Sequence, residues 1–370
     1  MGFPRAKLAR IAGINILILG VSLASLDLLL GKYFSEAPAL DIPAAQVDIK
    51  STYETSKIEN SAGIHIATYT RDYNGHRPYR NAPRNNKLIL TVGGSTTDQR
   101  WVDDRLTWQR ELENKLGIPV LNGGVDGQSS FGHLLSIENW HAKVLNPNYV
   151  DKIIFLVGVN DVRFTTSINA ASGNRYDSPT FLEKIRSYIV RRSFLVSRFR
   201  AAFLKLSILR GSGLAAPNGV SQIGYGDKNP SFLREPVKSV APKSEDYETD
   251  EYKHLFLRLL TSTKRHFKNS KIYIVQQQDP KCVLDEGNVL IRVSRNELHG
   301  IDAYCSALAS IYRAQENAIR DINSRRIITI KMYQDNPVPD LGFHDGIHTN
   351  SLGSKAIGDY LAKELTLIAQ

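Results

Sequence analysis

Residues 87–97 read KLILTVGGSTT, an apolar run that ends abruptly at two glycines and a serine. A short run rich in Ile, Leu and Val and bounded by turn residues is typical of a buried strand. Glycines directly after a strand allow a sharp backbone turn, which would leave the hydroxyl of Ser95 exposed at the edge of a sheet. Taken alone, Gly-Gly-Ser is more often a plain turn than a catalytic motif.

Outward from this stretch, similar apolar runs alternate with longer helical stretches. The predicted strands are Lys87–Val92, Ile118–Leu121, Lys152–Val157, Lys271–Gln276 and Ile327–Met332. The predicted helices are Arg105–Leu116, Phe131–Leu145, a pair within Phe181–Leu209 and Glu245–Phe267, Ile301–Ile322 and Ser351–Ile368. This alternation predicts a three-layer α/β/α sandwich around a five-stranded, mostly parallel sheet. In such sheets, functional sites form at the carboxyl ends of the strands.

Three further segments stand at predicted strand ends or before the last helix: NGGVDG (122–127), GVND (158–161) and DGIHTN (345–350). A glycine such as Gly124 can present its backbone N–H to a bound oxygen, and the Asn160 amide can donate to a developing oxyanion. Capping the next helix is the ordinary alternative for Asn160 or Asp161. We expect Asp126 and Asp161 to be structural.

The last of these segments carries an Asp–His pair. Asp345 and His348 are three residues apart on one predicted loop, so the carboxylate can accept the imidazole Nδ1–H and leave Nε2 free to take a proton from a hydroxyl. His344 lacks this spacing and is not expected to be the base. An isolated Asp–His pair is as often structural, so the prediction depends on all four segments occurring together.

Together and in this order, the four segments resemble the sequence blocks of the SGNH (GDSL-type) hydrolase superfamily, over roughly residues 87–370. The resemblance implies a flavodoxin-like sandwich with Ser95 as nucleophile, His348 as general base and Asp345 orienting His348. It further implies an oxyanion hole made by the N–H groups of Ser95 and Gly124 and by the Asn160 side chain, with no cofactor or metal.

The sequence departs from the family pattern in two places. Gly94 stands where the family has Asp in Gly-Asp-Ser. Since that Asp is not a triad member, we expect the chemistry to be unchanged. A long insertion at about residues 180–245 separates the third and last blocks, so the substrate cannot be carried over by analogy.

The amino terminus combines a basic flank with an apolar stretch. Arg5, Lys7 and Arg10 precede residues 11–30, which are long enough to cross a bilayer as a helix. Basic flanks favour the cytoplasmic side, which predicts a single-pass anchor with the rest of the chain outside. A cleaved signal peptide and a buried core helix are the alternatives.

The expected organisation is therefore a basic cytoplasmic tip (1–10), an anchor (11–30), a stalk and lead-in segment (31–84) and a hydrolase domain (85–370). Within the insertion, residues 184–210 carry eight basic side chains among apolar ones, a pattern of a helix lying on lipid or of an ordinary surface helix. Cys282 and Cys305 could pair in an exported domain or lie buried separately.

The net charge of +10 favours anionic surfaces such as phospholipid headgroups or acidic glycans. The sequence has no zinc-finger spacing, basic–aromatic RNA motif or basic leucine zipper, and we expect no nucleic-acid partner. The leading hypothesis is an extracytoplasmic serine esterase that cleaves acyl esters, acetyl esters first among them, on cell-envelope polysaccharide. The alternatives are an O-acyltransferase with the same triad, a lipid-directed esterase and a catalytically silent glycan-binding component.

Overall fold

The computed structural model describes residues 5–31, 33–34, 49–54, 66–79, 87–165, 181–196, 198–199, 249–285, 288–291 and 301–368. Its centre is a sheet whose neighbouring strands are all parallel, in the order β4-β3-β5-β6-β9. The strands are β3 (Leu88–Gly93), β4 (Val120–Asn122), β5 (Val150–Val157), β6 (Lys271–Gln276) and β9 (Ile327–Ile330). The predicted five-stranded sheet is confirmed, in flavodoxin-like order.

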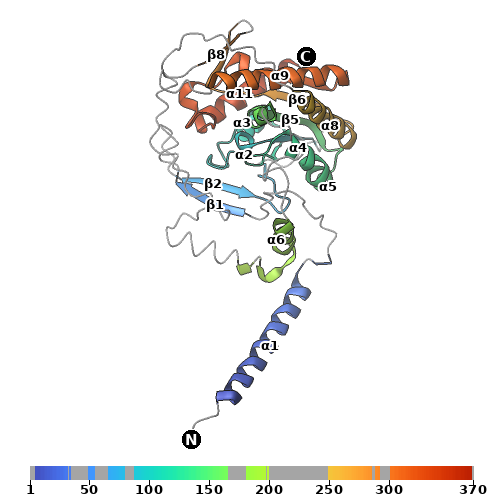
Figure 1. Ribbon diagram of the computed structural model, residues 1–370, viewed down its shortest axis with the longest axis vertical. Coiled ribbons are helices and arrows are strands. Elements are labelled where there is room, and N and C mark those ends of the chain that lie inside the picture. Colours follow the sequence, from blue (N-terminus) through green and yellow to red (C-terminus); the bar gives the residue numbers. More distant parts are fainter. Residues whose placement is uncertain are drawn as a thin grey trace.

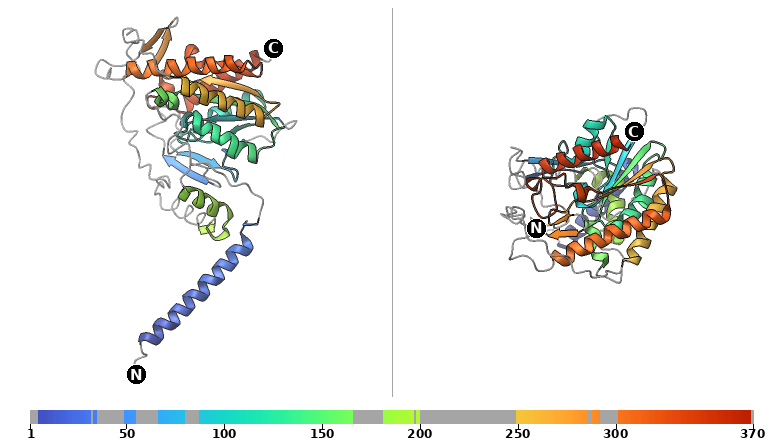
Figure 2. Two further views of the ribbon diagram at one scale, coloured as in Figure 1. Left: turned by 45° about the vertical axis from the view of Figure 1, so that its right-hand side comes forward. Right: turned by 90° about the horizontal axis from the view of Figure 1, so that it is seen from above.

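Helices cover both faces of the sheet (Figures 1 and 2). One face packs against α3 (Trp108–Leu116) and α11 (Ser351–Leu367); the other packs against α4 (Ser130–Ser136), α8 (Asp250–His266) and α9 (Ile301–Ile322). Strand periodicity explains the division, because Ile89 points into the first layer whereas Leu88 and Leu90 point into the second. The three-layer prediction is confirmed.

Several predicted boundaries shift for local reasons. The helix expected from Arg105 begins only at Trp108, because the Thr107 hydroxyl caps it by accepting from the Arg110 N–H at 3.3 Å. The helix expected over 131–145 is α4, a π-helical turn at Ile137–His141 and α5 (Ala142–Val144). Strand β9 ends before Met332, which opens the short helix α10 (Met332–Asp335).

Two antiparallel pairs were not predicted as such. Strands β1 (Ile49–Glu54) and β2 (Ile66–Arg71) pair within the segment expected to be stalk and lead-in. Strands β7 (Cys282–Asp285) and β8 (Asn288–Ile291) form a hairpin. A disulfide joins Cys282 to Cys305 in α9, which resolves the open question of the two cysteines.

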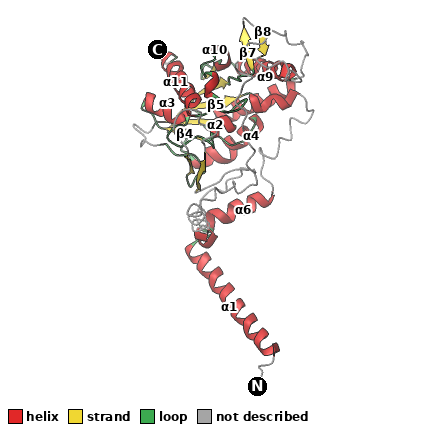
Figure 3. Ribbon diagram, turned by 90° about the vertical axis from the view of Figure 1, so that its left-hand side faces the viewer, coloured by secondary structure: helices red, strands yellow, loops and turns green. Residues whose placement is uncertain are grey.

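Helix α1 (Arg5–Leu30) projects away from the domain (Figure 3). Its part Arg10–Leu30 has a mean hydropathy of 2.0 with no residue buried, so it is long and apolar enough to span a membrane or to serve as a signal sequence. Helix α6 (Phe181–Arg192) lies at the start of the insertion. The remainder of the predicted basic helix, residues 200–210, lies outside the described residues, as does most of the insertion.

Candidate active site

The candidate site lies where the sheet changes its winding direction. Strand β3 has β4 on one side and β5 on the other. The connections from β3 to β4 and from β4 to β5 therefore run over opposite faces of the sheet. Crevices form at the carboxyl ends of strands at such a switch point. Ser95 directly follows β3, and Asn160 follows β5 in the 3-10 helix η3 (Val159–Thr165). The sheet topology therefore brings together two segments that are 65 residues apart.

Three predicted catalytic side chains meet in this crevice. The Ser95 Oγ lies 2.8 Å from His348 Nε2, and His348 Nδ1 lies 2.7 Å from Asp345 Oδ2. Both contacts have the length of good hydrogen bonds, and each ring nitrogen of His348 has its own partner. With Nδ1–H donating to Asp345, Nε2 is the acceptor for the serine proton.

The loop before α11 holds its Asp–His pair through its own backbone. Asp345 Oδ1 accepts from the N–H groups of Ile347 at 2.8 Å and His348 at 2.6 Å, which leaves Oδ2 for the imidazole. Burial of Asp345 opposes ionisation, but the hydrogen bond and charge of His348 outweigh it and hold the pKa of the carboxyl well below its usual range. The carboxylate is thus ionised at any physiological pH.

Ser95 opens the four-residue helix α2 (Ser95–Asp98). Its N–H is therefore one of the donors that a helix start leaves without an intrahelical partner. Gln99 ends this helix in the left-handed region, with φ of 49°, and its side-chain amide donates to Thr349 Oγ1 at 2.9 Å. Gln99 thus joins α2 to Thr349, the residue after His348. No spacing in the sequence indicates this contact.

Asn160 lies beside Ser95, and its side chain is held in place. Its amide nitrogen donates to the Gln128 carbonyl at 2.8 Å and packs on Gly94, and all three residues line a cavity together with Ser95 and His348. An amide nitrogen has two hydrogens, so one remains for a second acceptor. The sequence indicated Asn160 but not Gln128, which contributes a backbone carbonyl and so leaves no side-chain signal.

The Gly124 N–H, predicted as an oxyanion donor, has a partner within the protein. Its N–H donates to Asn122 Oδ1 at 2.9 Å, and a Cβ atom there would lie 2.4 Å from the backbone nitrogen of Asp98. A glycine is therefore required because α2 packs directly on it. Its N–H is hydrogen-bonded to Asn122, the last residue of β4. Glycine spacing alone cannot distinguish a residue that approaches another backbone from one that approaches a ligand.

Two buried arginines of the lead-in segment donate hydrogen bonds to the end of α2 and to Gly124. Arg71 donates to Asp98 Oδ1 at 2.7 Å and to the Gly124 carbonyl at 2.6 Å. Arg77 donates to the carbonyls of Asp98 at 2.6 Å and Gln99 at 2.7 Å.

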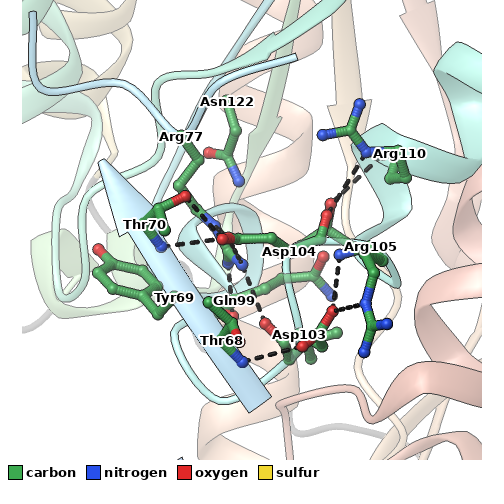
Figure 4. Close-up of polar contacts among 12 residues, drawn as sticks. Thr68, Tyr69, Thr70, Arg77, Gln99, Asp103, Asp104, Arg105, Arg110 and Asn122 are labelled. Atoms are coloured by element: carbon green, nitrogen blue, oxygen red, sulfur yellow. Dashed lines mark hydrogen bonds and ion pairs between the residues drawn. The ribbon is translucent and has the colours of Figure 1, made fainter. Parts of the chain in front are cut away.

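The same segment is also held to the loop that follows α2 (Figure 4). Asp104 accepts from Arg77 and from the Thr70 hydroxyl, the latter at 2.6 Å, and Asp103 accepts from the Thr68 N–H at 2.9 Å. Residues 66–79, expected to lead into the domain, are thus packed into it. Because these contacts join distant positions, hydrophobic periodicity gives no sign of them.

Two cavities flank the Ser95–His348 pair. One, of about 120 Å³, lies on the Asn160 side and includes Leu156, Val157 and Gln277 among its lining. The other, of about 30 Å³, is lined in part by Arg100, Trp101 and Asp126. Arg100 and Asp126 approach to 3.6 Å, while burial raises the pKa of the Asp126 carboxyl in spite of the nearby Arg100. The site is therefore chemically different on its two sides.

His344 and Asp161 make contacts other than the hydrogen bonds that join the triad. His344 Nε2 lies 3.7 Å from Asp345, and burial lowers the pKa of its imidazole to about 4. Asp161 accepts from the backbone and hydroxyl of Ser130, both at 2.7 Å, and so fixes the start of α4. Neither His344 nor Asp161 has a described contact with Ser95.

Metal ligation is the other chemistry available to this loop. His344, Asp345 and His348 each have a ligand atom within 4.8 Å of the others. The 2.7 Å contact between His348 Nδ1 and Asp345 requires a proton between these two atoms, which occupies both as hydrogen-bond partners. In the described arrangement the three residues therefore suit proton transfer better than metal ligation.

A hydroxyl, an imidazole and a carboxylate joined by hydrogen bonds, beside an amide donor, define the class of site found in serine hydrolases. No protein-family profile matches the sequence, and no curated protein does.

The structure is similar to several solved ones. A GDSL-like lipase from Bacteroides ovatus ATCC 8483 shares 12% identity over 78% of this chain and 55% of its own, with a TM-score of 0.43. A family two carbohydrate esterase from Cellvibrio japonicus shares 12% identity over 78% of this chain and 62% of its own, with a TM-score of 0.37. A family 3 carbohydrate esterase from Talaromyces cellulolyticus shares 9% identity over 76% of this chain and 97% of its own, with a TM-score of 0.36. The chain spans about half the length of the Bacteroides protein. Because similarity at this level does not bear on substrate or activity, the functional argument rests on this chain's own residues.

Proposed function

We propose that this protein is a serine esterase that cleaves short acyl esters, acetyl esters first among them, with Ser95 as nucleophile. The observation that carries the proposal is the continuous hydrogen-bonded path from Ser95 Oγ through His348 to Asp345. Serine is a weak nucleophile at its own pKa, so it needs a base already in contact with its hydroxyl. His348 Nε2 has that position.

The reaction follows from the geometry. As Ser95 Oγ attacks the acyl carbonyl, its proton passes to His348 Nε2, and the charge on the imidazolium is balanced by Asp345. The Ser95 N–H and the Asn160 amide stabilise the tetrahedral oxyanion, each donor lowering the barrier by about 3 kcal/mol. His348 then protonates the leaving alcohol, and water resolves the acyl-enzyme by the reverse steps.

The two cavities support an assignment of the two halves of the ester. Because the carbonyl oxygen must face Asn160, the acyl group belongs in the cavity of about 120 Å³ on that side, which suits a short chain. The alcohol then leaves past Arg100, Trp101 and Asp126. An aromatic ring beside charged hydrogen-bonding groups suits a polyhydroxylated alcohol, and a cell-envelope polysaccharide is the carrier we propose.

Two features support a place outside the cytoplasm for the domain, with α1 as an uncleaved anchor. The basic residues Arg5, Lys7 and Arg10 precede the apolar part of α1, which favours a cytoplasmic amino terminus. The Cys282–Cys305 disulfide is of a kind that persists in oxidising compartments such as the periplasm or the cell exterior.

Hydrolysis of p-nitrophenyl acetate by the full-length protein in detergent tests the activity. Ser95→Ala and His348→Ala should each lower kcat by at least about 10³-fold, since removal of either triad member disables the nucleophile. The exposed His254 provides the matched control, and His254→Ala should retain full activity. The proposal would be refuted if the wild-type protein showed neither turnover nor fluorophosphonate labelling that depends on Ser95. That result would favour a silent glycan-binding component.

An acetylated oligosaccharide tests the substrate and the fate of the acyl group. Trp101→Ala should raise KM severalfold both for the acetylated oligosaccharide and for p-nitrophenyl acetate, because the alcohol half of either ester lies on the Trp101 side. Release of free acid indicates hydrolysis, whereas acylation of an added unmodified oligosaccharide indicates the O-acyltransferase alternative. An unchanged KM for both substrates in Trp101→Ala would contradict the assignment of the alcohol side.

A further inference from the structure

Helix α6 begins the insertion and lies next to the end of α1, between α1 and the β1–β2 pair (Figures 1 and 3). Helix α1 carries one acidic residue, Asp27, in its last turn. Asp27 Oδ1 accepts from the Ser193 hydroxyl at 2.9 Å and from the Leu195 N–H at 2.8 Å, directly after α6. Oδ2 accepts from the Tyr33 hydroxyl at 2.6 Å. The end of α6 is thus fixed to the end of α1.

Close backbone packing strengthens this junction. A Cβ atom on Gly31 would lie 2.7 Å from the Arg192 carbonyl, so the two segments approach as closely as a glycine permits. The guanidinium of Arg192 lies 4.3 Å from the centroid of the Tyr188 ring, and Arg192 itself is 92% buried. The position of α6 relative to α1 is therefore set by several contacts on both sides of the junction.

The length of α1 places this junction near a bilayer surface. The 21 residues of Arg10–Leu30 extend over about 31 Å as a helix, close to the thickness of a hydrocarbon core. Asp27 is three residues from the end of that span, so its partners Ser193 and Leu195 lie at the level of the headgroups. A carboxylate at this depth is stabilised by its three hydrogen bonds.

The apolar side chains of α6 are exposed. Phe181, Ile185 and Ile189 follow one another at intervals of four residues, and Tyr188 lies beside them, so they form a stripe along one side of the helix. Exposed fractions are 76% for Phe181, 75% for Leu182, 40% for Ile185 and 39% for Ile189. Phe199, beyond the helix, is 72% exposed. No described residue covers this stripe to the extent expected of a helix packed on a core.

The composition of the segment favours lipid as the occupant. Besides the buried Arg192, residues 181–200 include five basic residues, Lys184, Arg186, Arg191, Arg198 and Arg200, and one acidic residue, Glu183. An amphipathic helix with apolar and basic residues lies in the interface, its apolar side at the acyl boundary and its cations near phosphates. A protein partner would not account for the continuity with a membrane-spanning helix.

We infer that α6 is a second membrane contact, lying in the headgroup layer of an anionic bilayer on the side where α1 emerges. The inference rests on the proposed anchoring of α1 and is independent of the esterase activity. Because Asp27 fixes α6 to α1, the two contacts act as one unit that limits how the catalytic domain can tilt on its tether. The ligand class is an anionic phospholipid surface.

Depth-dependent fluorescence quenching tests this contact with the full-length protein in nanodiscs of phosphatidylglycerol brominated along the acyl chains. Three single variants add one tryptophan each: Phe181→Trp in α6, Ile16→Trp within α1, and Leu341→Trp on the catalytic domain, which is 56% exposed and serves as the matched control. Emission is compared with wild type and with discs of unbrominated lipid.

The added emission of Phe181→Trp should be quenched at least about twofold more than that of Leu341→Trp, because interfacial helices bury their apolar side by about 5–10 Å. Quenching of Phe181→Trp should weaken in zwitterionic discs. Strong quenching of Ile16→Trp without excess quenching of Phe181→Trp would overturn the α6 contact and leave the anchor standing. Absence of quenching at Ile16 would overturn both, while aryl acetate hydrolysis in the same discs reports the esterase separately.

Discussion

Asn160 packs so closely on Gly94 that a Cβ atom on Gly94 would lie 2.2 Å from the Asn160 amide nitrogen. The backbone of Gly94, with φ of −84°, does not itself require glycine, so space is the reason for this residue. The family resembled by the sequence has Asp at this position. In this protein, the Asn160 amide and the absent side chain of residue 94 would occupy the same volume.

Gly94→Ala should therefore displace the Asn160 amide and lower kcat for aryl acetate by about 10- to 100-fold, less than or equal to the loss of a whole oxyanion donor. Gly94→Asp, which restores the family's motif, should be at least as damaging. Fluorophosphonate labelling would show that Ser95 is still reactive. In the double variant with Asn160→Ala, the effect of Gly94→Ala should largely disappear, and full additivity of the two changes would contradict this explanation.

Asp345→Asn tests the role of the carboxylate in orienting His348. An amide at this position can donate to Nδ1, which places the imidazole proton on Nε2 and removes its ability to accept from Ser95. We expect kcat to fall by about 10³- to 10⁴-fold with little change in thermal stability. Asp335→Asn is the control, because Asp335 is exposed and bonds only Tyr360 among the described contacts. Near-normal turnover in Asp345→Asn would show that the pair is structural.

The Cys282–Cys305 disulfide should contribute to stability. It closes a loop over a sequence separation of 23 residues, for which chain-entropy arguments give about 3 kcal/mol. Replacing both cysteines by serine should lower the free energy of unfolding by about that amount, measured by urea denaturation. Dithiothreitol should destabilise the wild type to a similar degree and have no effect on the double variant. Equal midpoints for wild type with and without reductant would contradict the prediction.

Two buried histidines predict loss of stability in acid. His76 Nε2 lies 3.0 Å from His141 Nδ1, and both rings stack with Trp140. Burial, aided by nearby positive groups, lowers the pKa of His141 to about 3 and that of His76 well below its ordinary value. Unfolded histidines bind protons below about pH 6.5, so the unfolded state binds more protons between pH 6.5 and about 3.

The free energy of unfolding should therefore fall as the pH drops through this window, by up to about 1.4 kcal/mol per pH unit for each histidine. Urea midpoints at pH 7.5, 6, 5 and 4 measure the slope. His141→Gln should flatten it, whereas His254→Gln, at an exposed position, should not. Equal slopes in wild type and His141→Gln would show that other groups govern acid unfolding.

The sequence predicted the central sheet well because strands buried on both faces are continuous apolar runs, as in Lys271–Gln276, which matches β6 to the residue. It also indicated Ser95, Asn160, Asp345 and His348, since each carries its chemistry in a side chain at a strand or loop end. It gave no sign of Gln99 or Arg71, nor of the packing of α2 on Gly124. Those three act through backbone groups and contacts between distant segments, which periodicity and spacing do not encode.

Arg71 and Arg77 join the segment 66–79 to the helix that begins at Ser95. Their guanidinium groups donate to four acceptors that solvent would otherwise have to satisfy. These are the carboxylate of Asp98 and the carbonyls of Asp98, Gln99 and Gly124. A minimal catalytic fragment must consequently begin upstream of Ile66 rather than at residue 85.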